Sequence, residues 1–161
     1  MKTENNRSSV RTPSFDAFYR EHHPQAYRSL TLALRNPDLA REAADEAMTR
    51  ALERWDVIGT YAAPEQWVFR VGLNWARSRL RRRRYESVGI LVEPSGSPAM
   101  PDPDVSSALA ALPLKLRAVV VLRLYLDWST EDTGRALGIA AGTVKSRLSR
   151  ALERLERVLE G

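Results

Sequence analysis

Residues 87–103 divide this chain into two parts. The segment reads SVGILVEPSGSPAMPDP, and nine of its 17 residues are Pro, Ser or Gly. A run this dense in Pro and Gly ends regular structure, because Pro cannot continue a helix and Gly weakens it. The sequence therefore predicts an N-terminal module over 13–85, a flexible Pro/Ser/Gly linker over 86–104 and a C-terminal module over 105–161.

Both modules are predicted to be helical. Pro13-Ser14 opens a short helix, Pro24 begins a second one, and Pro37-Asp38 starts a long amphipathic helix that Gly59 ends. Pro64 begins a further helix that continues into a run of four arginines. After the linker, apolar residues recur at helical spacing in four segments, 105–112, 114–126, 130–137 and 142–160. Strand-like alternation is absent, so the predicted fold class is all-α, with two small helical modules.

Composition excludes several kinds of chemistry. The chain has no Cys and only two His, adjacent at 22 and 23, which excludes disulfides, thiol nucleophiles and Cys-based zinc sites. The longest apolar run, 118–122, is far shorter than the ~20 residues that span a bilayer. The polar N-terminus lacks the apolar core of a secretion signal. We expect a soluble, cytoplasmic protein without membrane insertion, metal or cofactor.

The charge distribution indicates a nucleic-acid partner. The chain carries 25 Lys and Arg against 20 Asp and Glu, and residues 66–103 alone contribute +4 of the net +5. Most of that excess lies in the helix that starts at Pro64 and ends in the run 81–84. Of the 25 basic residues, 22 are Arg, which binds phosphate and guanine in a planar, bidentate way; a GC-rich bacterial genome also favours Arg.

A helix-turn-helix unit is predicted in the C-terminal module. Ser129 fits the cap of a helix that Gly138 ends, and only three residues separate this Gly from the next helix. Gly134 within the first helix costs ~1 kcal/mol relative to Ala, which predicts that this helix is the softer one. The second helix buries a leucine stripe and leaves polar residues outside at its N-terminal end, where such helices contact bases in the major groove. These candidate DNA-binding residues are Thr143, Lys145, Ser146, Arg147 and Arg150.

Two further patterns lie in the N-terminal module. The helix from Pro37 carries polar, mostly acidic residues at spacings of three and four, which share one face and suit a basic protein partner: Glu42, Asp45, Glu46 and Thr49. The helix from Pro64 interleaves Trp67 and Trp75 with arginines. Aromatic faces combined with cations are what single-stranded DNA binding requires.

The C-terminal motifs resemble region 4 of the extracytoplasmic-function (ECF) sigma factors. They are ALAALP at 108–113, RAVVVLR at 117–123, Leu137-Gly138, and GTVKSRLSRA at 142–151. The N-terminal module resembles region 2 of the same family. There the relevant residues are AREAADEAMTRA at 40–51, Trp67-Val68, Asn74 and Arg81-Arg82.

The resemblance implies a role for each group of residues. The acidic face over 42–49 docks on the β′ clamp of core RNA polymerase, while the C-terminal module meets the β flap and reads the −35 promoter element. The opened −10 element is met by Arg70, Asn74, Arg77, Ser78 and Arg81. A flipped base is held by the loop 56–66, and an anti-sigma factor commonly holds both modules. No residue is catalytic.

Two alternatives remain open at this stage. A plain helix-turn-helix regulator, dimerising through its N-terminal module, predicts a palindromic DNA site and no binding to polymerase. A metal-dependent nuclease using Glu42, Asp45 and Glu46 predicts cleavage that depends on magnesium.

Overall fold

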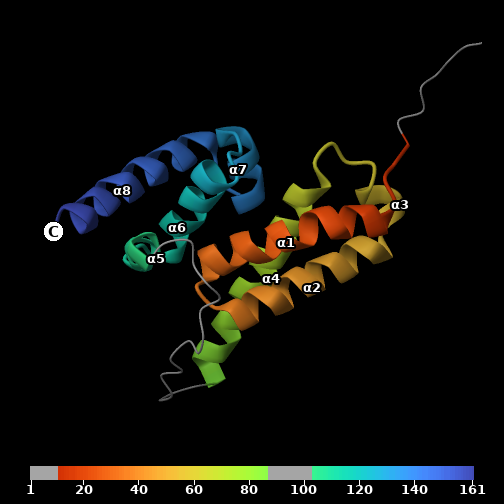
Figure 1. The fold of residues 1–161 in the computed structure, drawn as a ribbon, viewed down its shortest axis with the longest axis horizontal. Coiled ribbons are helices and arrows are strands. Elements are labelled where there is room, and N and C mark those ends of the chain that lie inside the picture. The colour runs from red at the N-terminus through yellow and green to blue at the C-terminus, as the bar shows by residue number, and fades with distance from the viewer. Residues whose placement is uncertain (1–10, 87–102) are drawn as a thin grey trace, which may run out of the picture.

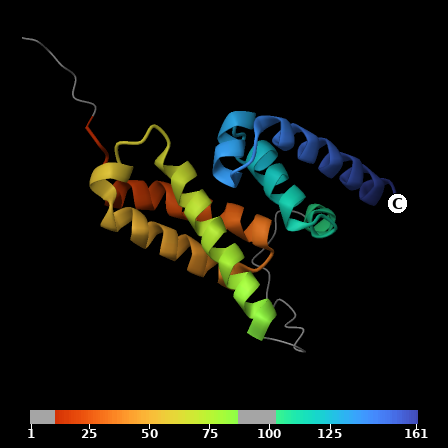
Figure 2. The ribbon, with the colours of Figure 1, turned by 180° about the vertical axis from the view of Figure 1, so that it is seen from behind.

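The computed structural model describes residues 11–86 and 103–161, so nearly all of the predicted linker lies outside the described residues. Within these ranges all regular structure is helical, as predicted. The N-terminal module contains the antiparallel pair α1 and α2 with α4 crossing it, and the C-terminal module lies beside the end of α1 (Figures 1 and 2). The elements are α1 (Phe15–Leu34), α2 (Pro37–Glu53), α3 (Trp55–Ile58), α4 (Pro64–Glu86), α5 (Pro103–Ala110), α6 (Leu114–Val120), the π-helical turn η1 (Val121–Tyr125), α7 (Thr130–Leu137) and α8 (Ala141–Glu160).

Side-chain caps define the ends of the first helices. The Ser14 hydroxyl accepts a hydrogen bond from the Ala17 amide at 3.2 Å, and the Asn36 side chain accepts one from Leu39 at 3.0 Å. Between α1 and α2, Arg35 adopts the left-handed conformation (φ 55°) and its amide returns to the Thr31 carbonyl. These caps satisfy helix-terminal groups and turn the chain back sharply enough for α1 and α2 to pack side by side.

The prediction that Pro24 starts a new helix is wrong, because α1 runs through it. Proline removes one amide donor, but Pro24 lies on the exposed side, where water can satisfy the carbonyl left without a donor. Two ring pairs span the turn before Pro24, with centroids 4.6 Å apart in each: Phe18 with His22 and Tyr19 with His23. Packing of this face thus outweighs the local cost of Pro24.

Small residues bring α2 close to its neighbours. Five alanines of α2 are fully buried, Ala40, Ala43, Ala44, Ala47 and Ala51. Since alanine adds little volume, α4 approaches α2 closely and fills the space with Val68, Phe69 and Leu73. The long helix predicted from Pro37 to Gly59 is interrupted at Arg54, whose φ of −124° and ψ of 27° separate α2 from the one-turn α3.

The helix-turn-helix prediction is confirmed in its main features. The Ser129 hydroxyl accepts a hydrogen bond from the Asp132 amide at 3.0 Å, and Gly138 ends α7 in the left-handed conformation (φ 67°). The second helix begins one residue earlier than predicted, at Ala141, with Ala140 preceding it in extended conformation. The turn is therefore shorter by one residue than the sequence suggested.

The two modules pack against each other, which the sequence analysis did not anticipate. Ala118, Leu122 and Ala136 of the C-terminal module belong to the same buried cluster as the N-terminal core. The rings of Phe69 and Trp128 meet edge to face, with centroids 5.6 Å apart. The apolar core of the N-terminal module therefore continues into the C-terminal module.

Arg117 ties α6 to the end of α1. Its Nε donates to the Ala33 carbonyl at 2.6 Å, and its Nη1 donates to the Leu112 carbonyl at 2.8 Å. Ala33 is one of the last four residues of α1, whose carbonyls have no partner within the helix. Burial, together with the nearby charge of Arg35, lowers the pKa of Arg117 to about 10, so the guanidinium stays charged at neutral pH.

Gly134 is required by the tight turn, a constraint that the sequence analysis did not include. A Cβ at this position would lie 2.7 Å from the Ile139 carbonyl oxygen, a backbone atom that cannot move away cheaply. We therefore expect Gly134→Ala to lower the free energy of unfolding by about 1–3 kcal/mol despite the better helix propensity of alanine. Urea unfolding followed by circular dichroism measures this.

Gly142 supplies the matched control, since a Cβ there meets nothing within 4 Å. Gly142→Ala in α8 should leave the free energy of unfolding unchanged or raise it by up to about 1 kcal/mol. Equal effects of the two substitutions would contradict the role given to Gly134.

Candidate functional site

The acidic face predicted from the sequence is present on α2. Glu42, Asp45 and Thr49 are exposed and Glu46 is half-buried at its edge, while the opposite side of the helix is the alanine-rich core. The Thr49 hydroxyl donates to the Asp45 backbone carbonyl at 2.9 Å, which leaves the Asp45 carboxylate available for side-chain contacts. The four residues therefore form one continuous surface, which we call the acidic surface.

Each carboxylate of the acidic surface already has a basic neighbour. Asp45 Oδ1 lies 2.8 Å from His23 Nε2 of α1, and Glu42 Oε2 lies 3.7 Å from Arg79 Nη2 of α4. Glu46 accepts a hydrogen bond from Nε of Arg50, one turn further along α2, at 2.9 Å. Such solvent-exposed pairs contribute only ~0–1 kcal/mol each, so a basic partner can replace them at little cost.

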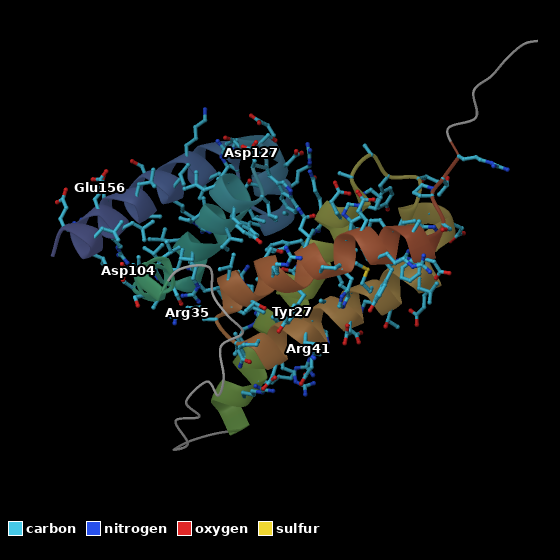
Figure 3. All side chains as sticks on the ribbon, viewed as in Figure 1. Tyr27, Arg35, Arg41, Asp104, Asp127 and Glu156 are labelled. Carbon is cyan, nitrogen blue, oxygen red and sulfur yellow. The ribbon has the colours of Figure 1, made fainter. Side chains whose placement is uncertain are left out.

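A cation borders this surface on the side of α1. Arg41 of α2 lies over the Tyr27 ring of α1 at 5.2 Å from its centroid, and its Nη2 donates to the Tyr27 hydroxyl at 3.4 Å (Figure 3). The hydrogen bond with Tyr27 raises the pKa of Arg41. The acidic surface thus ends at a fixed positive charge, which limits the area that a basic partner can occupy.

A groove of about 380 Å³ lies between α2 and α4. Three predicted −10 residues, Arg70, Asn74 and Ser78, recur at a spacing of four along α4 and line this groove together. Cations and aromatic rings alternate along its wall, the composition expected of a surface on which bases stack between phosphate contacts. Its full lining is Arg50, Trp67, Arg70, Val71, Asn74, Trp75, Ser78 and Arg82.

The remaining two predicted −10 residues do not line the groove. Arg81 is exposed, and its Nη2 reaches the Ser78 hydroxyl at 3.4 Å, at the rim. Arg77 lines a separate crevice between the two modules. The helical spacing alone does not predict this difference, because seven residues make almost two full turns, so Arg77 projects from nearly the same side of α4 as Arg70.

Arg50 and Arg82 line the groove but were not among the predicted −10 residues. Arg50 is on α2, and the sequence alone does not show which part of α2 faces α4. Arg82 continues the spacing of four from Arg70 through Ser78, a signal that could have found it within the run of four arginines. Trp75 is half-buried beneath the Arg79 guanidinium, which lies 5.3 Å from its ring centroid.

The first turns of α8 present the predicted −35 residues. Lys145, Ser146 and Arg150 are exposed, and Thr143 is partly exposed with its carbonyl accepting from the Ser146 hydroxyl at 3.1 Å. Val144 and Ala151, on the opposite side, are fully buried. Arg147 differs from the others because it is half-buried and lines the crevice between the modules.

Neither a metal site nor a membrane span is found in the part of the chain that the structure describes. Over residues 11–86 and 103–161, no three His, Asp or Glu side chains are grouped as a metal ion requires. None of the helices described there is both long enough and apolar enough to cross a bilayer.

Comparison with known proteins identifies similar sequences. Residues 104–155 match the family described as "Sigma-70, region 4". The ECF RNA polymerase sigma factor SigM of Mycobacterium tuberculosis is 35% identical over 156 residues, which cover 91% of this chain and 77% of SigM. The RNA polymerase sigma-E factor of Streptomyces coelicolor is 35% identical over 153 residues, covering 90% and 85% of the two chains.

Two solved structures share the fold of this chain. The sigma factor RpoE, crystallised with the anti-sigma factor NepR from Bartonella quintana, superposes with a TM-score of 0.76 and 26% identity over 91% of this chain and 96% of that one. CnrH, solved in complex with the cytosolic domain of CnrY, has a TM-score of 0.57 at 22% identity and shares the fold.

We expect Arg82, which lines the groove, to contact a phosphate of bound single-stranded DNA. Arg82→Ala should weaken binding of a single-stranded oligonucleotide, because one phosphate contact is lost. The slope of the logarithm of the binding constant against the logarithm of salt concentration should fall by about 0.7. Fluorescence anisotropy across a salt series measures that slope.

Arg154→Ala is the control for this measurement. Arg154 is exposed on α8 and its removal changes the net charge equally, but it does not line the groove. If both substitutions change the slope alike, the groove is not the binding surface.

Proposed function

This chain belongs to the ECF family of RNA polymerase sigma factors, and we propose which of its surfaces perform each step of that function. As a sigma factor it binds core RNA polymerase and directs promoter-specific transcription initiation. The observation that carries this conclusion is the 35% identity to SigM over 91% of the chain, which includes both modules. The alternative of a helix-turn-helix regulator that does not act with polymerase is not favoured, since it accounts only for the C-terminal module.

The proposed division of the chain follows its modules. Residues 13–85 act as sigma region 2, residues 105–161 act as region 4, and 86–104 connect them. The match of residues 104–155 to sigma-70 region 4 supports the second boundary. The chain has no catalytic residue in this proposal, because RNA synthesis belongs to the polymerase, and its place of action is the cytoplasm with that enzyme.

The acidic surface of α2 is the proposed docking site for the β′ clamp of the polymerase. Its exposed carboxylates, Glu42 and Asp45, suit a basic partner and repel DNA. Their pairs with Arg79 and His23 are solvent-exposed, so they can be exchanged for intermolecular pairs. A surface of this kind contributes to specificity and association rate more than to affinity.

The groove between α2 and α4 is the proposed site of the opened −10 element. Each base stacked on an aromatic side chain contributes ~1–3 kcal/mol, and the groove offers Trp67 and Trp75 between cations. Opening ten base pairs at ~1.4 kcal/mol per step costs on the order of 14 kcal/mol. This chain alone cannot supply the free energy needed to open the DNA, which is consistent with action inside a polymerase complex. The predicted loop 56–66 is partly helical, since it includes most of α3 and the start of α4, and this segment is proposed to hold the flipped base.

The first turns of α8 are the proposed −35 reader, with the β flap as the polymerase contact of this module. Lys145, Ser146 and Arg150 extend into solvent from the helix end that enters a major groove. An anti-sigma factor is a further proposed partner. The RpoE chain similar to this one over both modules was solved with the anti-sigma factor NepR.

The docking proposal is tested by reversing charge on the acidic surface. Glu42→Lys combined with Asp45→Lys should abolish binding to core polymerase, because two attractive contacts become repulsive. Binding is measured by anisotropy of the labelled chain with core polymerase from M. tuberculosis.

The control replaces a different Glu and a different Asp of the same module by Lys. Glu53→Lys with Asp56→Lys, both exposed at the end of α2 and in α3, should bind polymerase as the unchanged chain does. Unchanged polymerase affinity in the Glu42/Asp45 variant would refute the docking assignment.

The −35 proposal is tested at Arg147. Arg147→Ala should cost ~1–3 kcal/mol of binding to a selected promoter duplex and relax the preference for the base it reads. Arg157→Ala, an exposed position on the same helix, controls for lost charge. A loss that is equal on every sequence would make Arg147 a phosphate contact.

A further inference from the structure

Three cations from separate helices line the crevice at the contact between the modules. They are Arg77 of α4, Lys115 of α6 and Arg147 of α8, and the crevice has a volume of about 70 Å³. Among the residues that the structure describes, no Asp or Glu lines it. The rest of its wall is apolar and consists of Leu73, Leu114, Ala118, Leu137 and Ile139. The fold thus gathers three positive charges against an apolar wall.

These three cations have no ion-pair or side-chain hydrogen-bond partner within residues 11–86 and 103–161. Other arginines of the structure differ in this respect. Arg50 pairs with Glu46 at 2.9 Å, and Arg79 lies 3.7 Å from Glu42. Arg117, also at the contact between the modules, donates to a backbone carbonyl at 2.6 Å. The donors that line the crevice are therefore available to a ligand.

The electrostatics of the crevice favour an anionic ligand. Like charges repel one another, and apolar walls screen this repulsion less than water does. Arg77 and Arg147 are half-buried, so water surrounds neither guanidinium completely, whereas Lys115 is exposed. An anion in the crevice replaces the repulsion among the three cations by an attraction to each of them.

The size of the crevice and its donors indicate the class of anion. One water molecule needs ~10–15 Å³ of such a space, so about 70 Å³ has room for a few waters or for one phosphate group. A nucleoside is too large to enter. A guanidinium binds two phosphate oxygens at once, while an ammonium group acts as a point charge. Two arginines and a lysine can therefore engage all the free oxygens of a phosphate, whereas chloride offers only a single atom.

We propose that this crevice binds one phosphate group of a small free anion, either inorganic phosphate or the phosphate of a nucleotide, between Arg77, Lys115 and Arg147. The site goes beyond the promoter contacts proposed above and does not rest on them. Arg77 and Arg147 also belong to the residues proposed to bind DNA, but Lys115 does not. Substitution of Lys115 therefore tests this site separately from those contacts.

Isothermal titration calorimetry of the full chain tests the binding, with inorganic phosphate as the probe and potassium chloride holding the ionic strength constant. Phosphate should saturate a single site per chain. The same heats with added chloride in place of phosphate would show general screening only and would overturn the proposal. Adenosine monophosphate distinguishes the two sources. Binding at least as tight as that of phosphate assigns the site to nucleotides, and weaker or absent binding assigns it to the inorganic ion.

Lys115→Glu tests the site within the chain. The substitution places a carboxylate beside Arg77 and Arg147 and should weaken phosphate binding about tenfold or more. Lys115 is exposed, so the buried core is unchanged. Arg154→Glu changes the net charge equally at an exposed position of α8 outside the crevice, and it should leave the phosphate affinity within about twofold. An equal loss in both variants would overturn the site.

Nuclear magnetic resonance locates the bound anion. The Nε–Hε signals of Arg77 and Arg147, identified by their loss in Arg77→Lys and Arg147→Lys, should shift as phosphate is added, with the midpoint found by calorimetry. The Arg154 signal should stay in place. Shifts confined to other arginines, such as the run 81–84, would put the phosphate elsewhere and overturn the proposal. Circular dichroism verifies that each variant is folded, and the signals of the unchanged chain decide the question if Lys115→Glu is not.

Discussion

The contact between the end of α1 and α6 joins the two modules of this protein through both a polar and an apolar interaction. Arg117 donates a hydrogen bond to the Ala33 carbonyl, which has no partner within α1. Leu32 and Ala33 also pack into an apolar cluster of the other module. Each module is small and buries a limited apolar area on its own. Joining them at this contact gives both a larger interior, and it also decides which charged residues face solvent and which face each other.

The charged surfaces follow from how the helices of the N-terminal module pack. The alanines of α2 allow α4 to approach closely, so the acidic surface and the cationic groove lie on adjacent sides of the same helix pair. Glu46 and Arg50 form the boundary, since Arg50 pairs with Glu46 and also lines the groove. The proposed polymerase-docking surface and the proposed −10 groove therefore lie on different sides of one module.

Much of the local structure was predictable because its signals are local. Ser129 and Gly138 bound α7 as their capping preferences require, and Pro64 begins α4. The sequence misled where packing outweighs the preference of a single residue. Pro24 lies within a continuous helix, and Gly134 is demanded by the Ile139 carbonyl that packs against it. The division of the −10 set also required the structure, because a list of arginines on one helix does not say which neighbour each one faces.

By itself, the amino-acid sequence determined most of the helices, the caps of α7, the opposite charges of α2 and α4, and the resemblance to ECF sigma factors. These properties depend on residues a few positions apart, or on motifs that are read directly. Only the tertiary structure decided that the modules are docked, that Arg50 joins the groove, and that Arg77 and Arg147 share a crevice. Those features depend on contacts between residues as far apart as Ala33 and Arg117, whose pairing no local pattern specifies.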